Sequence, residues 1–174
     1  MKIDGIEQIK AKISQDNRGV SKKILENGSE TFAVDDVFIS ISNKNVIRGM
    51  HFQPKPFGQK KRISVIEGRI QGVVLDLREN SNTFKQFQEI VLSDKDDYVL
   101  SIPEYCAWGF RGLDEVNIVT YCICGKYQKE KDLGIRWDSF GYDWEIDCPI
   151  MNDRDRRQVT LDEYLKEQER GKSI

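Results

Sequence analysis

The sequence predicts an all-β protein, a sandwich or barrel of antiparallel strands followed by a short C-terminal helix. Short apolar runs recur along the chain, several with alternating apolar residues, and clusters of Gly, Asn, Asp and Pro separate them. Runs of this kind between turn residues are typical of antiparallel strands. They lie at residues 32–42, 62–78, 88–93, 98–103 and 116–127.

Two connections are predicted to be hairpin turns, and the tail is predicted to be helical. The turns are Glu67-Gly68-Arg69 and the acidic cluster at 94–97. Thr160 stands three residues before Glu163, which is a capping-box pattern that begins a helix. Gly171 is a suitable residue to end it. Only this tail has helical character.

The length and composition indicate a single folded domain that spans residues 1–174. A chain of 174 residues and 20.2 kDa leaves no length for a second domain, and no repeat or linker interrupts it. It is long enough to bury a core without disulfides or a structural metal. Its composition, 39% hydrophobic and 32% charged, is that of a globular rather than a disordered protein.

The charge balance argues against nucleic acid or a membrane as a partner. The net charge is −2 and the pI is about 5.6, so the chain has no general attraction for polyanions. No stretch approaches the roughly 20 apolar residues of a membrane span, and the first residues lack the apolar core of a signal peptide. The expected location is the cytoplasm.

The four cysteines are expected to be reduced. No C-x-x-C pair is present, so a zinc site is not expected. Cys122 and Cys124 are two residues apart and would share one face of a strand. Cys106 and Cys148 stand apart in the sequence. In a reducing compartment, buried free thiols are the simplest interpretation of all four.

His51 is the only histidine, and it restricts the possible chemistry. A lone histidine is more often structural than catalytic. It cannot form the clusters of two or three histidines that hold a metal in metal-binding β-barrels, so no metal is expected. Base catalysis needs only one imidazole, which ordinarily titrates near neutral pH.

The surroundings of His51 favour catalysis. Residues 48–53, RGMHFQ, resemble the R-G-[LM]-H-F-Q signature of dTDP-4-dehydrorhamnose 3,5-epimerases and related sugar-nucleotide epimerases. Other family-like motifs follow in order over about residues 16–155. They include D-x-R-G at 16–19, V-L-D-L-R-x-x-S-x-T-F at 74–84, A-x-G-F at 107–110 and G-I-x-W at 134–137.

The resemblance implies a cupin-like jelly-roll β-barrel and an isomerase. Members of this family invert C3, C5 or both in a nucleotide-diphosphate 4-keto hexose or heptose, for the synthesis of a cell-surface polysaccharide. The ketone acidifies the hydrogens on both neighbouring carbons, so the reaction needs a base, a cation at the enolate oxygen and an acid on the opposite face. No cofactor is implied, because the ketone itself accepts the electron pair.

The resemblance also implies four catalytic residues. His51 matches the base, Asp155 the carboxylate that hydrogen-bonds it, Lys61 the cation and Tyr121 the acid. Strand alternation would send the neighbours of Lys61 to the opposite face. A solvated Asp155 and a core Tyr121 remain the structural alternatives.

Six further residues match substrate-binding positions. Arginine suits a diphosphate because its planar fork donates two hydrogen bonds at once. Arg18 and Arg48 match diphosphate-binding arginines, Gln53 and Gln59 supporting polar contacts, and Tyr127 a tyrosine that lines the sugar site. Trp108 stands where the family usually has histidine.

The tryptophan at position 108 leaves several outcomes open. Indole is larger than imidazole and cannot accept a proton. Restriction to one carbon, a different sugar or loss of activity could each follow, and an active enzyme with shifted specificity is favoured because the base, cation and acid are present.

Two other functions compete with the epimerase. One is a 3,4-ketoisomerase on the same type of barrel, and the other is an inactive sugar-nucleotide-binding protein. The resemblance further implies a homodimer in which strands of one subunit extend the sheet of its partner, which would cover exposed sheet edges.

Overall fold

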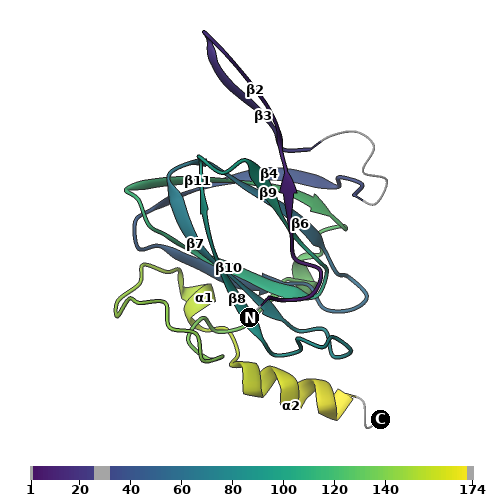
Figure 1. The fold of residues 1–174 in the computed structure, drawn as a ribbon. Coiled ribbons are helices and arrows are strands. Elements are labelled where there is room, and N and C mark those ends of the chain that lie inside the picture. The colour runs from purple at the N-terminus through teal and green to yellow at the C-terminus, as the bar shows by residue number, and fades with distance from the viewer. Residues whose placement is uncertain (1, 26–31, 172–174) are drawn as a thin grey trace.

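The computed structural model describes residues 2–25 and 32–171 and consists mainly of two facing five-stranded sheets. Figure 1 shows them end-on, as the two walls of a barrel. The first sheet has the strand order β1 (Glu7–Lys10), β9 (Tyr98–Ile102), β6 (Lys60–Glu67), β11 (Val116–Cys124) and β4 (Asp36–Asn43). The second has the order β12 (Leu133–Gly134), β5 (Ile47–Phe52), β10 (Cys106–Gly112), β7 (Arg69–Asp76) and β8 (Phe87–Ser93). Together they form the predicted cupin-like jelly-roll barrel.

Strand β7 shows how the two hydrophobic cores arise. Ile70 and Val74 point between the sheets, whereas Val73 belongs to a second core outside the second sheet. The chain after β12 covers that outer face, with Trp144 and Leu161 among its buried residues. Because both faces of β7 are buried, apolar residues stand at consecutive positions, Val73, Val74 and Leu75, rather than at alternating ones.

The predicted turns and the tail helix are confirmed. The turn at Gly68, whose φ is +80°, joins β6 to β7, and residues 94–97 join β8 to β9. Helix α2 runs from Leu161 to Gly171. The capping box forms as predicted, because Thr160 Oγ1 accepts from the Glu163 backbone N–H at 3.1 Å and the Glu163 carboxylate accepts from the Thr160 N–H at 2.8 Å.

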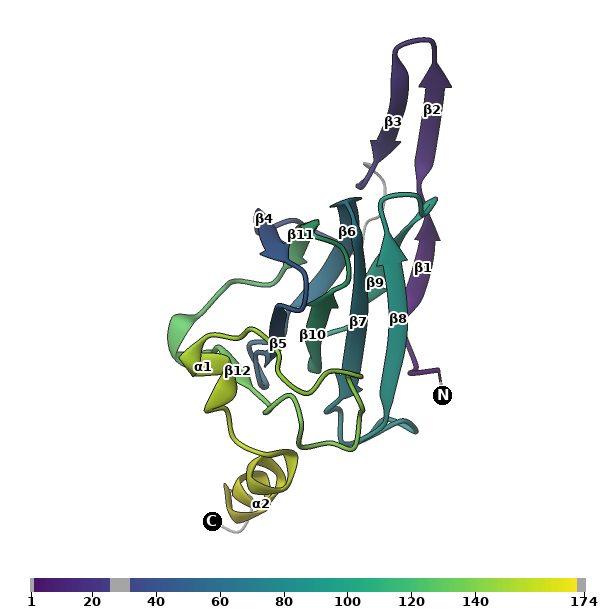
Figure 2. The same cartoon turned by 90° about the vertical axis from the view of Figure 1, so that its left-hand side faces the viewer.

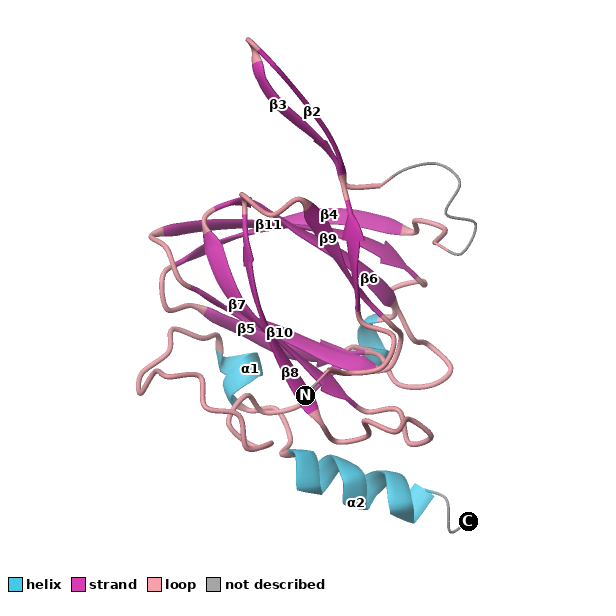
Figure 3. Ribbon diagram, viewed as in Figure 1, coloured by secondary structure: helices cyan, strands magenta, loops and turns pink. Residues whose placement is uncertain are grey.

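The expectation that only the tail is helical was wrong. Helix α1 (Asp153–Arg156) and the 3₁₀ turn η1 (Lys129–Lys131) precede it. Figure 3 shows the short α1 close to the barrel and the longer α2 outside it. Asn152 caps α1, since its side chain accepts from the Asp155 N–H at 2.7 Å. A single turn that depends on its cap carries no helical periodicity in the sequence.

A hairpin of β2 (Lys12–Asp16) and β3 (Gly19–Lys23) projects beyond the barrel. Figures 1 and 2 show it extending away from both sheets. Nearly all of its residues are exposed. An isolated two-stranded hairpin is marginally stable in water, and this one leaves its apolar residues Ile13 and Val20 exposed.

The cysteines are free, but not all are buried. Cys106 and Cys122 are buried, Cys124 is half-buried and Cys148 is exposed, which corrects the expectation for that residue. Cys148 lies in the irregular segment before α1, which covers the barrel only in part. Within residues 2–25 and 32–171, no helix is long and apolar enough to cross a membrane.

Candidate active site

A cavity of about 400 Å³ opens between the two sheets, which is within the range of small-molecule sites. Strands β4, β6 and β11 supply one wall, and β5 and β10 supply the other. All predicted site residues except Arg18 and Gln53 line it. They are Arg48, His51, Gln59, Lys61, Trp108, Tyr121, Tyr127 and Asp155.

His51 and Asp155 form a hydrogen-bonded pair at the wall made by the second sheet. The His51 Nε2 atom lies 2.8 Å from Asp155 Oδ1, and the Gly49 N–H donates to Asp155 Oδ2 at 3.1 Å. An ionised carboxylate only accepts, so Nε2 carries a proton, and in the neutral form of the imidazole the lone pair is on Nδ1. The pair therefore presents a base in a fixed orientation.

The same contacts keep Asp155 ionised. Burial acts to raise the pKa of its carboxyl group, but the hydrogen bond from His51 and the Gly49 N–H outweigh this and hold the pKa below its usual value. The carboxylate is almost fully buried, whereas the imidazole is one-third exposed, at 2% and 33%. The solvated alternative for Asp155 is therefore excluded.

Lys61 places a cation in the opposite wall. Its side chain lines the cavity and is 8% exposed, while its neighbour Arg62 stacks over Phe32, with its guanidinium carbon 4.5 Å from the ring centroid. Alternation along β6 thus separates these two residues as predicted. Burial lowers the pKa of Lys61 to about 8. Among the described residues no carboxylate forms an ion pair with it, so an anionic ligand atom would satisfy the charge.

Tyr121 lies on β11, in the sheet that faces His51. It is 6% exposed and lines the cavity, and burial raises its pKa to about 12, so the phenol is neutral. Phe38 of β4 stacks on it, with ring centroids 4.6 Å apart and an angle of 10° between the planes. A neutral phenol across the cavity from an imidazole is a suitable acid for the face opposite the base.

Arg48, Gln59 and Tyr127 lie around the mouth of the cavity. The Arg48 guanidinium donates to Ser42 Oγ at 2.8 Å and to the Ile41 carbonyl at 3.1 Å, and is otherwise exposed. Gln59 donates to the Gly125 carbonyl at 3.0 Å. Tyr127 is 55% exposed and donates to Asp132 at 3.1 Å. These groups could contact the outer part of a ligand.

Two predicted site residues do not lie in this cavity. Gln53 is 2% exposed, and its side-chain amide joins loop segments through Phe57, Lys126 and Gln128. Its polar atoms are engaged in the fold rather than available to a ligand. Arg18 sits in the projecting hairpin, where it pairs with Asp16. The barrel of its own chain does not bring it near His51.

Several cavity residues were not identified from the sequence. Asp36, Phe38 and Ser40 alternate along β4 and all face the cavity. The apolar run at 32–42 contained that signal, because residues two apart share a face, but the sequence does not say which face is internal. Asp132, which forms an ion pair with Arg154 at 2.8 Å, carried no recognisable signal.

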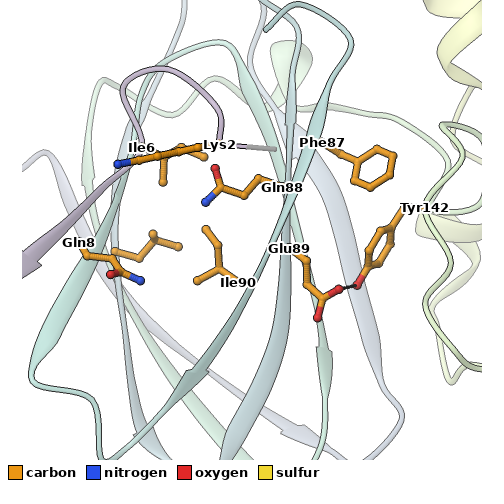
Figure 4. Close-up of a pocket in the computed structure, with 9 residues that line it drawn as sticks. Lys2, Ile6, Gln8, Phe87, Gln88, Glu89, Ile90 and Tyr142 are labelled. Atoms are coloured by element: carbon orange, nitrogen blue, oxygen red, sulfur yellow. Dashed lines mark hydrogen bonds between the residues drawn. The ribbon is translucent and has the colours of Figure 1, made fainter.

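A larger cavity of about 840 Å³ lies beside the edge strand β8 and contains none of the predicted site residues. Figure 4 shows its lining, with Ile6 and Gln8 on one side and Phe87 and Tyr142 on the other. Its carboxylate, Glu89, is already engaged, because Tyr142 donates to it at 2.8 Å. The smaller cavity is therefore the one with a base, a cation and an acid.

Known proteins share both sequence and fold with this chain. The dTDP-4-dehydrorhamnose 3,5-epimerase of Methanothermobacter thermautotrophicus is 37% identical over 173 residues, with 92% of each chain covered. The Sulfolobus tokodaii enzyme of that name superposes with a TM-score of 0.84 at 34% identity, over 91% of this chain and 92% of that one. The Bacillus anthracis enzyme, solved with TDP and PPi bound, gives 0.85 at 29% identity, over 92% of this chain and 99% of that one.

The fold, the cavity and these relatives define a sugar-nucleotide epimerase, an isomerase built on a cupin-like jelly-roll barrel. The sequence model described as dTDP-4-dehydrorhamnose 3,5-epimerase matches residues 1–163. The chain belongs to the dTDP-4-dehydrorhamnose 3,5-epimerase family.

Proposed function

We propose that this protein inverts C3, C5 or both of a nucleotide-diphosphate 4-keto sugar by removing a proton and returning one to the opposite face. The observation that carries the proposal is that His51 and Tyr121 line one cavity from opposite sheets, with the buried Lys61 in the same sheet as Tyr121. The inverted sugar would serve a cell-surface polysaccharide.

The chemistry follows from these three groups. Neutral His51 takes the proton from the carbon beside the ketone, and the electron pair moves to the carbonyl oxygen. Lys61 donates to the resulting enolate, and Asp155 stabilises the imidazolium. Tyr121 then gives its proton to the other face, leaving a phenolate and an imidazolium that exchange protons with solvent to restore the enzyme. Electrons and protons balance, and the substrate supplies the only electron acceptor.

The nucleotide part of the substrate would lie toward the cavity mouth. Arg48 is the exposed arginine there, and its guanidinium can bind a diphosphate oxygen. The Bacillus anthracis relative was solved with TDP bound, which supports a thymidine nucleotide for this chain. The acidic Asp36 and Asp132 also line the cavity and are suited to sugar hydroxyls rather than phosphate.

Proton exchange in D₂O tests the proposed function. Incubation with a dTDP-linked 4-keto-6-deoxyhexose should place deuterium at C3, C5 or both, and NMR of the product identifies the inverted carbon. A product with its ketone at C3 would indicate the 3,4-ketoisomerase instead. Binding of the nucleotide without deuterium incorporation in any of several 4-keto sugar nucleotides would indicate the inactive binding protein.

A homodimer would explain both the projecting hairpin and the position of Arg18. The hairpin exposes Ile13 and Val20, at 43% and 64%, and the outer face of β4 exposes Val37, Ile39 and Ile41. A second copy packed on these apolar surfaces would cover them and could bring Arg18 to the cavity mouth of its partner. Arg18 would then bind the diphosphate in trans.

Sedimentation equilibrium is expected to give twice the chain mass, and Arg18→Ala should raise KM with little change in kcat. Lys12→Ala is the matched control, because Lys12 begins strand β2 at the opposite end of the hairpin from the turn that holds Arg18, and it should leave KM unchanged. A monomer with full activity would contradict this arrangement.

A further inference from the structure

Trp108 contacts the oxygen atom of Tyr121. The indole of Trp108 reaches from β10 across the interior, and its Nε1 lies 3.4 Å from Tyr121 Oη on β11. Both side chains are buried, at 4% and 6% exposed. Indole N–H is a donor only, so the phenol oxygen must accept this hydrogen bond. The proton of Tyr121 therefore points away from Trp108.

Gly72 provides the space that the indole occupies. It lies on β7 next to β10, two residues before Val74, which is the register partner of Trp108. A Cβ atom at Gly72 would overlap Cη2 of the indole and lie 2.8 Å from Cζ3. Real side chains do not tolerate such contacts, so any larger residue at position 72 would displace the indole. Gly72 and Trp108 are thus sterically matched.

Tyr121 is held from two directions. Phe38 stacks on its ring and fixes the plane, while the indole N–H fixes the oxygen. A ring held in this way has lost its rotational freedom before a substrate binds, and this reduces the cost of reaching the reactive geometry. The O–H is left with the other directions, and on that side lie its neighbour Ser40 of β4 and the cavity that Ser40 and His51 also line.

We propose that Trp108 is the positioning residue for the acid: its N–H orients the proton of Tyr121 toward the substrate and stabilises the phenolate left after proton donation. Gly72 leaves the space in which the indole of Trp108 can take this position. The inference rests on the proposed function, in which Tyr121 gives its proton to carbon. In that step the phenol O–H bond breaks and a C–H bond forms. The hydrogen bond from Trp108 then becomes charge-assisted and stronger.

The measurement follows two events separately in D₂O. Removal of the carbon proton by His51, whose side chain is 33% exposed, lets solvent deuterium enter the recovered substrate. Inversion requires Tyr121 as well. Trp108→Phe keeps an aromatic ring but removes the N–H, so inversion should slow by about 10–100-fold while deuterium uptake into recovered substrate continues. KM should change little, because the ketone still meets His51 and Lys61.

Gly72→Ala tests the steric match. As a single substitution, Gly72→Ala should lower the rate of inversion to about the same extent as Trp108→Phe does. In the Trp108→Phe background it should lower the rate of inversion little further, because both indole atoms that it would strike are absent and only the milder contact with the Ile90 carbonyl oxygen, at 3.2 Å, remains. Equal loss of exchange and inversion in Trp108→Phe would show a merely structural role and overturn the inference, as would additive losses in the double variant. Absence of any exchange in the unaltered protein would instead refute the proposed function.

Discussion

Replacing His51 by asparagine is expected to lower the rate of proton exchange by about 10²–10⁴-fold, the usual contribution of a general base. The imidazole is the only group in the cavity whose lone pair is held in place by a buried carboxylate, among the residues that the structure describes. Asparagine fills similar space but cannot accept a proton at neutral pH. Affinity for dTDP, measured by calorimetry, should remain nearly unchanged.

A second variant separates the base from the hydrogen-bond donor. His51→Gln retains an amide that can still donate to Asp155, yet it also lacks a base. Both variants should therefore lose exchange to a similar extent, and both should unfold near the temperature of the unaltered protein. Turnover close to normal in either variant would refute the role given to His51.

Replacing Asp76 by asparagine is expected to cause the largest loss of stability. Its carboxylate is fully buried and accepts from Arg78 at 2.7 Å, Ser81 at 2.6 Å and Thr83 at 2.7 Å. An asparagine amide cannot accept all of these bonds and leaves the Arg78 charge without its counter-ion. Breaking such a pair costs about 3–5 kcal/mol, so thermal unfolding should occur roughly 10 °C lower.

The matched control is Asp138→Asn. Asp138 also pairs with an arginine two residues away, Arg136, at 2.6 Å, but both side chains are about 40% exposed or more. Exposed pairs contribute little, so the melting temperature should shift by no more than a degree or two. Equal shifts in the two variants would contradict the importance given to burial.

The contribution of Asp76 to the stability of the protein should decrease as the pH falls. Burial would raise the pKa of its carboxyl group, but the hydrogen bonds from Arg78, Ser81 and Thr83 outweigh burial and lower it to about 2, from an ordinary 3.8. When the pKa of a carboxyl group is lower in the folded state than in the unfolded state, its full contribution to stability is present above the unfolded-state pKa. This contribution is lost as the pH falls toward the folded-state pKa. The stability gap between the unaltered protein and Asp76→Asn should therefore narrow between about pH 4 and pH 2.

The sequence contained enough to predict the barrel but not every element. Alternation and turn residues located β6, β7, β8, β9 and β11, because these strands bury one or both faces. The β2–β3 hairpin was missed since its residues are mostly polar and nearly all exposed, so no buried face produces an apolar alternation in the sequence. Helix α1 was missed because a single capped turn has no periodicity.

Those residues of the candidate site that lie in family motifs could be identified from the sequence. The family motifs named His51, Lys61, Tyr121 and Asp155, and all four line one cavity. The contact between Trp108 and Tyr121 could not be foreseen, because it depends on how two sheets face each other. Similarly, nothing in the sequence indicates that the amide of Gln53 binds loop carbonyls instead of facing the cavity.

The pairing of His51 with Asp155 joins positions 104 residues apart. During translation the inner strands of both sheets emerge from the ribosome well before α1, so the barrel can begin to form around an imidazole that still lacks its carboxylate. The orientation of the base is completed only after Asp155 has been synthesised, 104 residues later than His51.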